Sequence, residues 1–434
     1  MNFVTSLVLY GAIMAVVWGI YTFRNRRVEE KSIAIKAIAV EAGLTEPASL
    51  HPSIDPGMCL GCGNCAKVCP EGDILGIIGG KAELVEPTHC IGHGACAAAC
   101  PTGAITLVFG TAKRGIDLPK VGPDFQTNVP GIFIAGELGG MGLIRNAVTQ
   151  GRQAVESARK LNGIGAPGQL DLVIVGAGPA GLAAALASKQ HGLTYVVIEQ
   201  DDLGGTVFKY PRGKIVMTAP AVLPIVGQVN FKETTKEALL DFWRNIERKH
   251  RLNVRYHEQV SRVEKNGSIF TVHTSTGTER CTAVLLAIGR RGTPRKLEVP
   301  GEDLSKVVYQ FIDAEQYKGR HVLVVGGGDS ALEAAGSIAE QAGTTVTLSY
   351  RSDAFSRAKP KNRERVERMS GQGQLQVMLS SKVRGITTDS AEIEWNGSRQ
   401  VIPNDAVIIC AGGILPTEFL KSAGIEMETK YGTA

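Results

Sequence analysis

Cysteines between positions 59 and 100 have the types and spacing that can hold iron–sulfur clusters. The first run, Cys-x-x-Cys-x-x-Cys-x-x-x-Cys-Pro, places its cysteines at Cys59, Cys62, Cys65 and Cys69. A second run keeps the register but has a histidine in second place, at Cys90, His93, Cys96 and Cys100. Three thiolates on one tight loop can bind three corners of a [4Fe–4S] cubane, while the fourth cysteine of each run points toward the other cluster. The spacing therefore predicts two iron–sulfur clusters.

This crossed arrangement divides the predicted ligands into two sets. The first set is Cys59, Cys62, Cys65 and Cys100. The second set is Cys69, Cys90 and Cys96, with His93 as a candidate fourth ligand. If His93 binds iron, a neutral imidazole replaces a thiolate and raises the reduction potential of that cluster, as histidine ligation does in Rieske centres. If His93 does not bind, the cluster could be [3Fe–4S].

A structural zinc site is the alternative for these cysteines, but it would normally use two separated cysteine pairs. Residues 55–109 instead resemble a two-cluster bacterial ferredoxin domain along their whole length. Seven of the nine cysteines lie in the two runs, which indicates metal ligation in a reducing compartment and not a disulfide scaffold.

Length and composition limit the remaining classes. The 434 residues are enough for two or three compact domains. Hydrophobic residues make up 44% of the chain and charged residues 21%, which is the composition of a folded protein. The net charge of +5 comes without a long basic run, so the sequence gives no support for nucleic-acid binding.

Residues 171–199 contain the signature of a dinucleotide-binding strand, loop and helix. An apolar strand leads into a G-x-G-x-x-G loop, an alanine-rich helix follows, and the next strand ends in an acid. The glycines let the backbone approach a pyrophosphate, the helix N-terminus stabilises its charge, and the acid can hydrogen-bond a ribose diol. The predicted binding residues are Gly176, Gly178, Pro179, Ala180, Gly181 and Glu199.

A second strand, glycine loop and helix begins at His321. Its predicted binding residues are Gly326, Gly328, Asp329 and Ser330. The next strand, over 344–350, ends without an acid and is followed by Arg351 and Arg357. An acid favours the free 2′-hydroxyl of NAD, whereas arginines accommodate the 2′-phosphate of NADP. The sequence therefore favours NADPH and leaves NADH open.

The two glycine loops together resemble the two-dinucleotide flavoprotein family that includes thioredoxin reductases and thioredoxin-reductase-like ferredoxin–NADP reductases. The supporting strings are Gly327-Gly328-Asp329-Ser330-Ala331, Ala287-Ile-Gly289 and Ala411-Gly-Gly413. The resemblance implies an α/β fold with two Rossmann-like three-layer domains, FAD at the first loop and a nicotinamide nucleotide at the second. The family's H-R-R-x-x-x-R cluster for the 2′-phosphate is only partly present here.

Thioredoxin reductases carry a redox-active Cys-x-x-Cys just before the second loop, where residues 307–320 of this chain contain no cysteine. A dithiol relay is therefore not expected. Cys281 and Cys410 each lie alone in a strand-like apolar run, and we expect both to be buried packing residues.

One segment of the family lies out of order in this chain. The family completes its FAD domain near the C-terminus with a segment resembling T-x-x-P-G-x-F-x-A-G-D, whereas the similar stretch here, 127–151, precedes the first glycine loop. We therefore expect a circular permutation, with residues 162–168 as the new joining linker and the cluster domain fused close to the flavin. The resemblance implies flavin-binding roles in this segment for Gly136, Glu137, Arg145, Ala147 and Val148. Glu137 replaces the family's Asp.

Residues 3–23 contain no charged side chain, and as a helix they would span about 31 Å, enough for the core of a bilayer. Arg24, Arg26 and Arg27 follow, which favours a transmembrane anchor over a signal peptide or a buried core helix. The positive-inside rule places the later residues in the cytoplasm. We therefore predict a single-pass anchor in the inner membrane that contacts the lipid bilayer through residues 3–23.

The expected organisation has seven parts along the chain. They are a transmembrane anchor (1–27), a linker (28–54), a small α+β two-cluster ferredoxin domain (55–109), the permuted closing segment of the FAD domain (110–161), the FAD-binding Rossmann domain (162–290), the NAD(P)-binding domain (291–410) and a return to the FAD domain (411–434).

This organisation leads us to expect a membrane-anchored oxidoreductase that passes electrons between NAD(P)H, FAD and two clusters. FAD is suited to join them because nicotinamide gives two electrons while clusters accept one at a time. Hydride transfer strictly requires no protein acid or base, and we name no catalytic residue. The expected partner is a membrane-bound cytochrome or quinone-reactive subunit, and a homodimer is left open. Two alternatives remain: a ferredoxin-fed FAD reductase of a soluble substrate, and a non-catalytic redox-sensing subunit.

Overall fold

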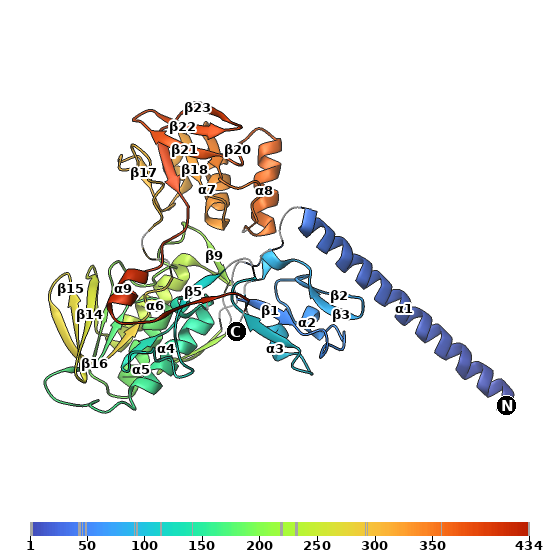
Figure 1. The fold of residues 1–434 in the computed structure, drawn as a ribbon, viewed down its shortest axis with the longest axis horizontal. Coiled ribbons are helices and arrows are strands. Elements are labelled where there is room, and N and C mark those ends of the chain that lie inside the picture. Colours follow the sequence, from blue (N-terminus) through green and yellow to red (C-terminus); the bar gives the residue numbers. More distant parts are fainter. Residues whose placement is uncertain are drawn as a thin grey trace. The chain divides into compact units, whose positions relative to one another are not determined.

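The computed structural model describes the chain as two compact units (Figure 1). Unit 1 comprises Met1–Gly115, Ser356–Pro360 and Tyr431–Ala434, and unit 2 comprises Ile116–Phe355 and Lys361–Lys430. The described residues are 3–432 apart from 42–44, 46, 48–49, 91, 93, 113–114, 141, 218–219, 231–232, 291, 293 and 357. Side chains are described from Tyr10 onward, except at 89, 217 and 233.

Unit 1 begins with one long helix, α1 (Phe3–Glu41). It continues without a break through 28–41, so the first part of the segment that we assigned to a linker is helical. The reason is packing, because the second half of α1 lies against the strand β2 (Leu75–Ile78). The strand β1 (His51–Ile54), which was also assigned to the linker, pairs with β4 (Ile105–Val108).

A transmembrane helix was predicted over residues 3–23. Among the residues that the structure describes, no helix is both long and apolar enough to cross a membrane. In α1 the described side chains begin at Tyr10, and the charged residues begin at Arg24.

The remainder of unit 1 is a small cysteine-rich domain, residues 50–112. It contains two antiparallel strand pairs, β1–β4 and β2–β3. Its other elements are β3 (Lys81–Leu84), the 3-10 turn η1 (Pro87–His89), and two single-turn helices, α2 (Asn64–Lys67) and α3 (Ala95–Ala98). Its core combines aliphatic side chains with three of the predicted ligands: Leu75, Ala82, Ala104, Ile105, Cys59, Cys65 and Cys96. These three cysteines therefore face inward.

Unit 2 contains two parallel-rich sheets of the Rossmann type, so the predicted α/β class is confirmed. The first sheet has the order β13-β8-β7-β16-β15-β14, with β6 pairing with β16. Its strands are β13 (Val254–Arg255), β8 (Tyr195–Ile198), β7 (Leu170–Val175), β16 (Thr278–Leu286), β15 (Ile269–Thr274), β14 (Val260–Asn266) and β6 (Ile132–Ile134). Because side chains alternate along each strand, one set packs against helices and the other set forms a second core.

Three helices contribute to the first of these cores: α4 (Ile144–Ala158), α5 (Pro179–Gln190) and α6 (Lys236–His250). Figure 1 shows α4, α5 and α6 beside this sheet. The core on the other face includes side chains of β14 and β15 and is completed by α9 (Thr417–Ser422), which supplies the buried Leu420. Between β8 and α6 lie four short strands, β9 (Ile215–Met217), β10 (Ala221–Leu223), β11 (Gly227–Val229) and β12 (Glu233–Thr235).

The segment that we expect to be permuted adds a strand and a helix to this first sheet. β6 runs parallel to the end of β16, the 3-10 turn η2 (Glu137–Gly139) follows, and α4 then packs along α5. β5 (Ile116–Pro119) pairs antiparallel with β25 (Met427–Lys430), with Ile116 opposite Lys430. The last described strand of unit 2 therefore lies beside its first strand.

The second sheet of unit 2 has the order β17-β24-β18-β19-β20. Its strands are β17 (Val307–Val308), β24 (Ala406–Ile409), β18 (His321–Val325), β19 (Thr345–Ser349) and β20 (Gln376–Met378). The helix α7 (Asp329–Ala339) packs on one face of this sheet, against β18 and β19. Side chains of β18, β20 and β24 on the other face share a core with a three-stranded antiparallel sheet. That sheet is β21 (Lys382–Ile386), β22 (Ser390–Trp395) and β23 (Ser398–Pro403); the remaining elements are η3 (Ala314–Tyr317) and α8 (Pro360–Gly371).

Candidate functional site

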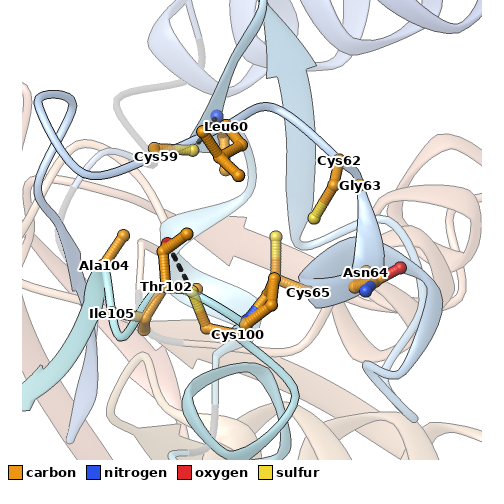
Figure 2. A pocket seen from close by; sticks show the side chains of 12 residues that line it. Cys59, Leu60, Cys62, Gly63, Asn64, Cys65, Cys100, Thr102, Ala104 and Ile105 are labelled. Carbon is orange, nitrogen blue, oxygen red and sulfur yellow. Dashed lines mark hydrogen bonds between the residues drawn. The ribbon is translucent and has the colours of Figure 1, made fainter.

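Four cysteines from both runs surround one pocket of the cysteine-rich domain: Cys59, Cys62, Cys65 and Cys100. In Figure 2 their sulfur atoms turn toward a common space, with Leu60 and Ile105 at its edge. These four are the residues that the crossed arrangement assigns to a single cluster. Cys59 and Cys65 are buried, and Cys62 is exposed.

A second pocket is lined by Cys69, Cys90 and Cys96. Its cysteines again come from both runs. His93, the candidate fourth ligand, lies outside the described residues, so its role stays a prediction. Within the described residues, no three histidine, cysteine or acidic side chains are placed to share one metal ion; in a cubane each cysteine binds a different iron atom.

The two runs have the same local backbone where both are described. Gly63 has φ 74° and precedes α2, and Gly94 has φ 77° and precedes α3. Glycine adopts this left-handed conformation without steric cost, which allows each loop to turn sharply into its helix. The replacement of the second cysteine by His93 therefore leaves this turn of the second loop unchanged.

Burial and neighbouring groups shift the pKa values of the cysteine thiols in the two pockets. Burial raises the pKa of the Cys65, Cys69 and Cys96 thiols, and it raises the pKa of Cys90 to about 11. In contrast, the hydroxyl of Thr102 lowers the pKa of Cys100. The raised pKa values mean that Cys65, Cys69, Cys90 and Cys96 favour the protonated thiol in the absence of a metal, and cysteine must lose its proton to bind one. A soft, sulfur-rich ligand set of this kind fits an iron–sulfur cluster.

The first glycine loop of unit 2 has the close packing that a pyrophosphate site needs. A Cβ at Gly181 would overlap the Gly176 carbonyl oxygen, so α5 approaches the end of β7 more closely than a side chain would allow. α5 begins at Pro179, and no side chain caps its N-terminus. Its N–H groups can therefore donate hydrogen bonds to a phosphate, and Ala180 lies in this first turn.

Glu199 is buried at the end of β8 and holds the loop in place. Its carboxylate accepts a hydrogen bond from the Ala177 N–H at 2.7 Å and another from the Asp201 N–H at 2.9 Å. Each carboxylate oxygen has further acceptor capacity for a ribose hydroxyl. The residues of this loop therefore fit FAD.

The 136–151 segment packs directly against this loop. A Cβ at Gly151 of α4 would overlap the Ala180 carbonyl oxygen, and the Gly136 N–H donates to Gln150 Oε1 at 2.8 Å. Ala147 and Val148 are buried beneath the loop, whereas Arg145 is exposed. The two buried residues thus support the site through packing.

Glu137 has a neighbour that sequence reasoning missed. Burial lowers the pKa of Arg290, and the negative charges of Glu137 and Asp117 oppose that shift. The Arg290 guanidinium donates to the Asp117 carbonyl oxygen at 3.1 Å. In the sequence, Arg290 directly follows the string Ala287-Ile-Gly289, and this position is the signal by which it could have been found.

The second glycine loop precedes α7 in the same way. Gly328 stands at the N-terminus of α7 with no side-chain cap, and a Cβ at Gly326 would lie 2.5 Å from the Cys410 carbonyl oxygen. The N-terminus of α7, with Asp329 and Ser330 in its first turn, is therefore open to a nucleotide phosphate. Arg351 is exposed after β19, and Arg357 lies outside the described residues.

Two further contacts at this loop were not predicted. The Tyr350 ring covers Gly327 so closely that a Cβ there would overlap it, and the ring stacks on Phe355 at 5.6 Å between centroids. Asn362 donates to Asp329 Oδ1 at 2.7 Å and to Glu333 Oε1 at 3.2 Å. Of these residues, only Tyr350 could have been found from the sequence, because it occupies the position of the histidine in the family's H-R-R-x-x-x-R sequence.

The two isolated cysteines differ in burial. Cys281 is fully buried in β16, and burial raises its pKa to about 12. Cys410 is only partly buried, so the expectation of a buried residue is wrong for it.

Comparison with known proteins identifies relatives of both parts of the chain. Residues 173–433 match the pyridine nucleotide-disulphide oxidoreductase family, and residues 51–101 match the 4Fe-4S dicluster domain. The chain is 32% identical to ferredoxin–NADP reductase from Ignicoccus hospitalis over 268 residues, which cover 60% of this chain and 83% of that protein. It is 28% identical to bacilliredoxin reductase Bdr from Bacillus subtilis, over 60% of this chain and 82% of that protein.

A solved structure gives a similar result. Bacillithiol disulfide reductase Bdr from Staphylococcus aureus is similar with a TM-score of 0.54 and 30% sequence identity, over 59% of this chain and 81% of that one. The family match covers more than half of the chain and contains both glycine loops, while a 4Fe-4S match covers the cysteines. The chain therefore belongs to the pyridine nucleotide-disulphide oxidoreductase family, as an FAD-dependent NAD(P)H oxidoreductase that also carries a 4Fe–4S domain.

Proposed function

We propose that this oxidoreductase exchanges electrons between a nicotinamide nucleotide and two iron–sulfur clusters, with FAD as the intermediate carrier. The observation that carries the proposal is the division of seven cysteines between two pockets, each lined by cysteines from both runs. A two-cluster domain exchanges its fourth ligands in this way.

The second cluster is part of this proposal. Cys69, Cys90 and Cys96 line its pocket, and His93 is the candidate for a fourth ligand. Iron binding by His93 gives a [4Fe–4S] cluster with one imidazole ligand, and its absence gives a [3Fe–4S] cluster. EPR of the reduced protein beside a His93→Cys variant separates the two types.

The residues of unit 2 bind and orient the two nucleotides. FAD, when bound, supplies the conversion between two-electron nicotinamide chemistry and one-electron cluster chemistry. The N-terminus of α5 holds a pyrophosphate, and Glu199 accepts from a ribose hydroxyl while it braces the loop. The N-terminus of α7 has the corresponding role for NAD(P)H.

Anaerobic titration with NADPH, and separately with NADH, tests this function. Absorbance of both the flavin and the clusters should fall as nucleotide is added. Reduction of the flavin with clusters that stay oxidised would instead support a ferredoxin-fed reductase of a soluble substrate. Nucleotide binding without turnover of an artificial acceptor would support a redox-sensing subunit.

We also propose that the redox partner is a membrane protein, such as a cytochrome or quinone-reactive subunit, and that the enzyme works at the cytoplasmic side of the inner membrane. Large apolar side chains on α1 are exposed, among them Met14, Trp18 and Tyr21 at 73%, 70% and 62%. Arginines 24, 26 and 27 follow them, and exposed apolar surface of this size favours lipid or a membrane protein. Recovery of the full chain in the membrane fraction, and its loss when residues 10–23 are made polar, tests this proposal.

Reduction of a disulfide is a second candidate function. It is favoured by the similarity to two proteins named as Bdr reductases. Because residues 307–320 contain no cysteine, the chain would have to act without a dithiol in that position. NADPH consumption with bacillithiol disulfide, compared with consumption in the presence of a ferredoxin, distinguishes the two functions.

A further inference from the structure

The polar half of α1, from Glu29 to Lys36, is docked on the β2–β3 hairpin of the cysteine-rich domain. Lys31 Nζ lies 2.6 Å from Asp73 Oδ2, and Lys36 pairs with Glu83. Ser32 is buried, and a Cβ at Gly76 of β2 would lie 2.6 Å from its hydroxyl oxygen. The helix and the hairpin are therefore in direct contact.

Glu29 reaches the turn of this hairpin. The Gly79 N–H donates to Glu29 Oε1 at 2.7 Å. Gly79 and Gly80 have φ values of 58° and 71°, as a two-residue type I′ turn requires. The carboxylate of α1 thus fixes the amide of the first turn residue.

The other side of the turn touches the loop that carries Cys59. A Cβ at Gly61 would overlap the Gly80 carbonyl oxygen, so the turn and this loop are in contact. Lys81 Nζ donates to the Cys59 carbonyl oxygen at 2.7 Å. The Ala82 N–H donates to Cys59 Sγ at 3.3 Å, beside a second donor at 3.4 Å, the Gly61 N–H. The position of the hairpin therefore controls one of the two N–H···S hydrogen bonds to Cys59.

Hydrogen bonds to ligand sulfurs are among the factors that set the reduction potential of an iron–sulfur cluster. They stabilise the reduced form more, because reduction adds negative charge to the cluster. We propose that Glu29 is a positioning residue for the cluster held by Cys59, Cys62, Cys65 and Cys100: it holds the Gly79–Gly80 turn so that Ala82 donates to Cys59. This inference rests on the proposed function, because it requires that cluster.

The test is an EPR-monitored redox titration of the full chain with its clusters. The first cluster is the one held by the cysteines of the first pocket, including Cys59 and Cys100. Glu29→Ala should make the potential of this first cluster more negative than in the wild type. The control is Glu30→Ala, which removes the same charge from the neighbouring, exposed position of α1. Loss of a negative charge alone would move the potential in the positive direction, so the two causes have opposite signs.

Two further variants separate the hydrogen bond from the charge. Glu29→Gln keeps an acceptor oxygen and should not shift the potential to more negative values. Glu29→Asp keeps the charge, but its shorter side chain does not reach the Gly79 N–H. This variant should therefore shift the potential to more negative values, as Glu29→Ala does. It replaces Glu29→Ala in the test if that variant does not accumulate. The second cluster is an internal reference and should be unchanged in every variant.

Failure of this inference is distinguishable from failure of the proposed function. Absence of cluster signals in the wild type, or clusters that NAD(P)H does not reduce, would overturn the proposed function. Clusters that form and are reduced, with the same first potential in Glu29→Ala or Glu29→Asp as in the wild type, would overturn the positioning role alone.

Discussion

Cys100 lines the same pocket as Cys59, although the two cysteines belong to different runs. In return, Cys69 of the first run lines the second pocket with Cys90. Each pocket therefore depends on a residue that sequence order would assign to the other.

Replacing Cys100 should change the first cluster and leave the second unchanged. Cys100→Ser leaves the pocket of Cys59, Cys62 and Cys65 with one thiolate fewer, while the second pocket keeps all of its described cysteines. Iron and sulfide analysis with EPR should show that the first cluster is lost or converted to [3Fe–4S] and that the other keeps its signal. Cys69→Ser should give the reverse result, and Cys281→Ser, a buried residue outside both pockets, should leave both clusters in place. Loss of the second signal in Cys100→Ser would contradict the crossed assignment.

The contact between α4 and α5 should be sensitive to a single methyl group. Gly151→Ala would place a Cβ against the Ala180 carbonyl oxygen, which is backbone and cannot move aside easily. Overpacking of this kind typically costs about 1–3 kcal/mol, so we expect a lower melting temperature and a smaller content of bound FAD. Gly371→Ala at the end of α8 is the matched control, because its Cβ meets open space and should change stability by less than about 1 kcal/mol. Equal effects of the two variants would exclude this explanation.

Arg351 should decide between the two nicotinamide nucleotides if it binds the 2′-phosphate. It is exposed directly after β19, where such a contact is made in folds of this type. A hydrogen bond to a charged group contributes about 1.5–3 kcal/mol, so Arg351→Gln should raise the KM for NADPH by roughly tenfold or more. Steady-state kinetics should show an unchanged KM for NADH. A similar rise for both nucleotides would indicate a structural role.

Glu302 should make stability depend on acidic pH. Its side chain is buried, and burial opposes ionisation. Its carboxylate accepts hydrogen bonds from the Leu297 N–H at 2.6 Å, the Glu298 N–H at 2.7 Å and the Tyr309 hydroxyl at 2.8 Å. These hydrogen bonds outweigh the effect of burial, so the pKa of Glu302 is lowered. A lowered pKa in the folded state contributes stability above the unfolded value, about 4.3 for glutamate. That contribution is lost as pH falls through the folded pKa.

Glu302→Gln should therefore lower the melting temperature at pH 7, and the difference from the wild type should shrink below about pH 4.3. Melting curves from pH 7 to pH 3 measure this difference, with Asp303→Asn as an exposed neighbouring control. A difference that is constant with pH would show that the ionised form of Glu302 is not the one that stabilises the fold.

Local patterns in the sequence predicted the parts of the site that depend on nearby residues. The run from Cys59 to Cys69 and the loop from Gly176 to Gly181 are short segments whose spacing alone predicts a ligand, and the structure shows cysteines of this run lining two pockets and an uncapped N-terminus of α5 at the loop. His93 and Arg357 lie outside the described residues, and their roles stay predictions.

Contacts between distant segments could not be predicted in the same way. The Ala82 N–H reaches Cys59 only because a hairpin folds back over the loop, and the Tyr350 ring reaches Gly327 only across neighbouring strands. The mixed charges of residues 29–41 are compatible with a helix but do not require one, and the ion pairs that hold this part of α1 are made with distant residues. In each case the information lies in tertiary packing.

The pairing of β25 with β5 has a consequence for how such a chain can arise. With Lys430 opposite Ile116, the two strands are the arms of a hairpin that lacks its turn. In the sequence, the cysteine-rich domain leads directly into one of these arms. The circular permutation that the sequence predicts and the fusion of the cysteine-rich domain therefore fall at one location, and a single rearrangement of the gene would account for both. We predict that joining 430 to 116 by a short turn, and opening the chain at 162–168, gives a unit 2 that still folds, with the cysteine-rich domain released as a separable module.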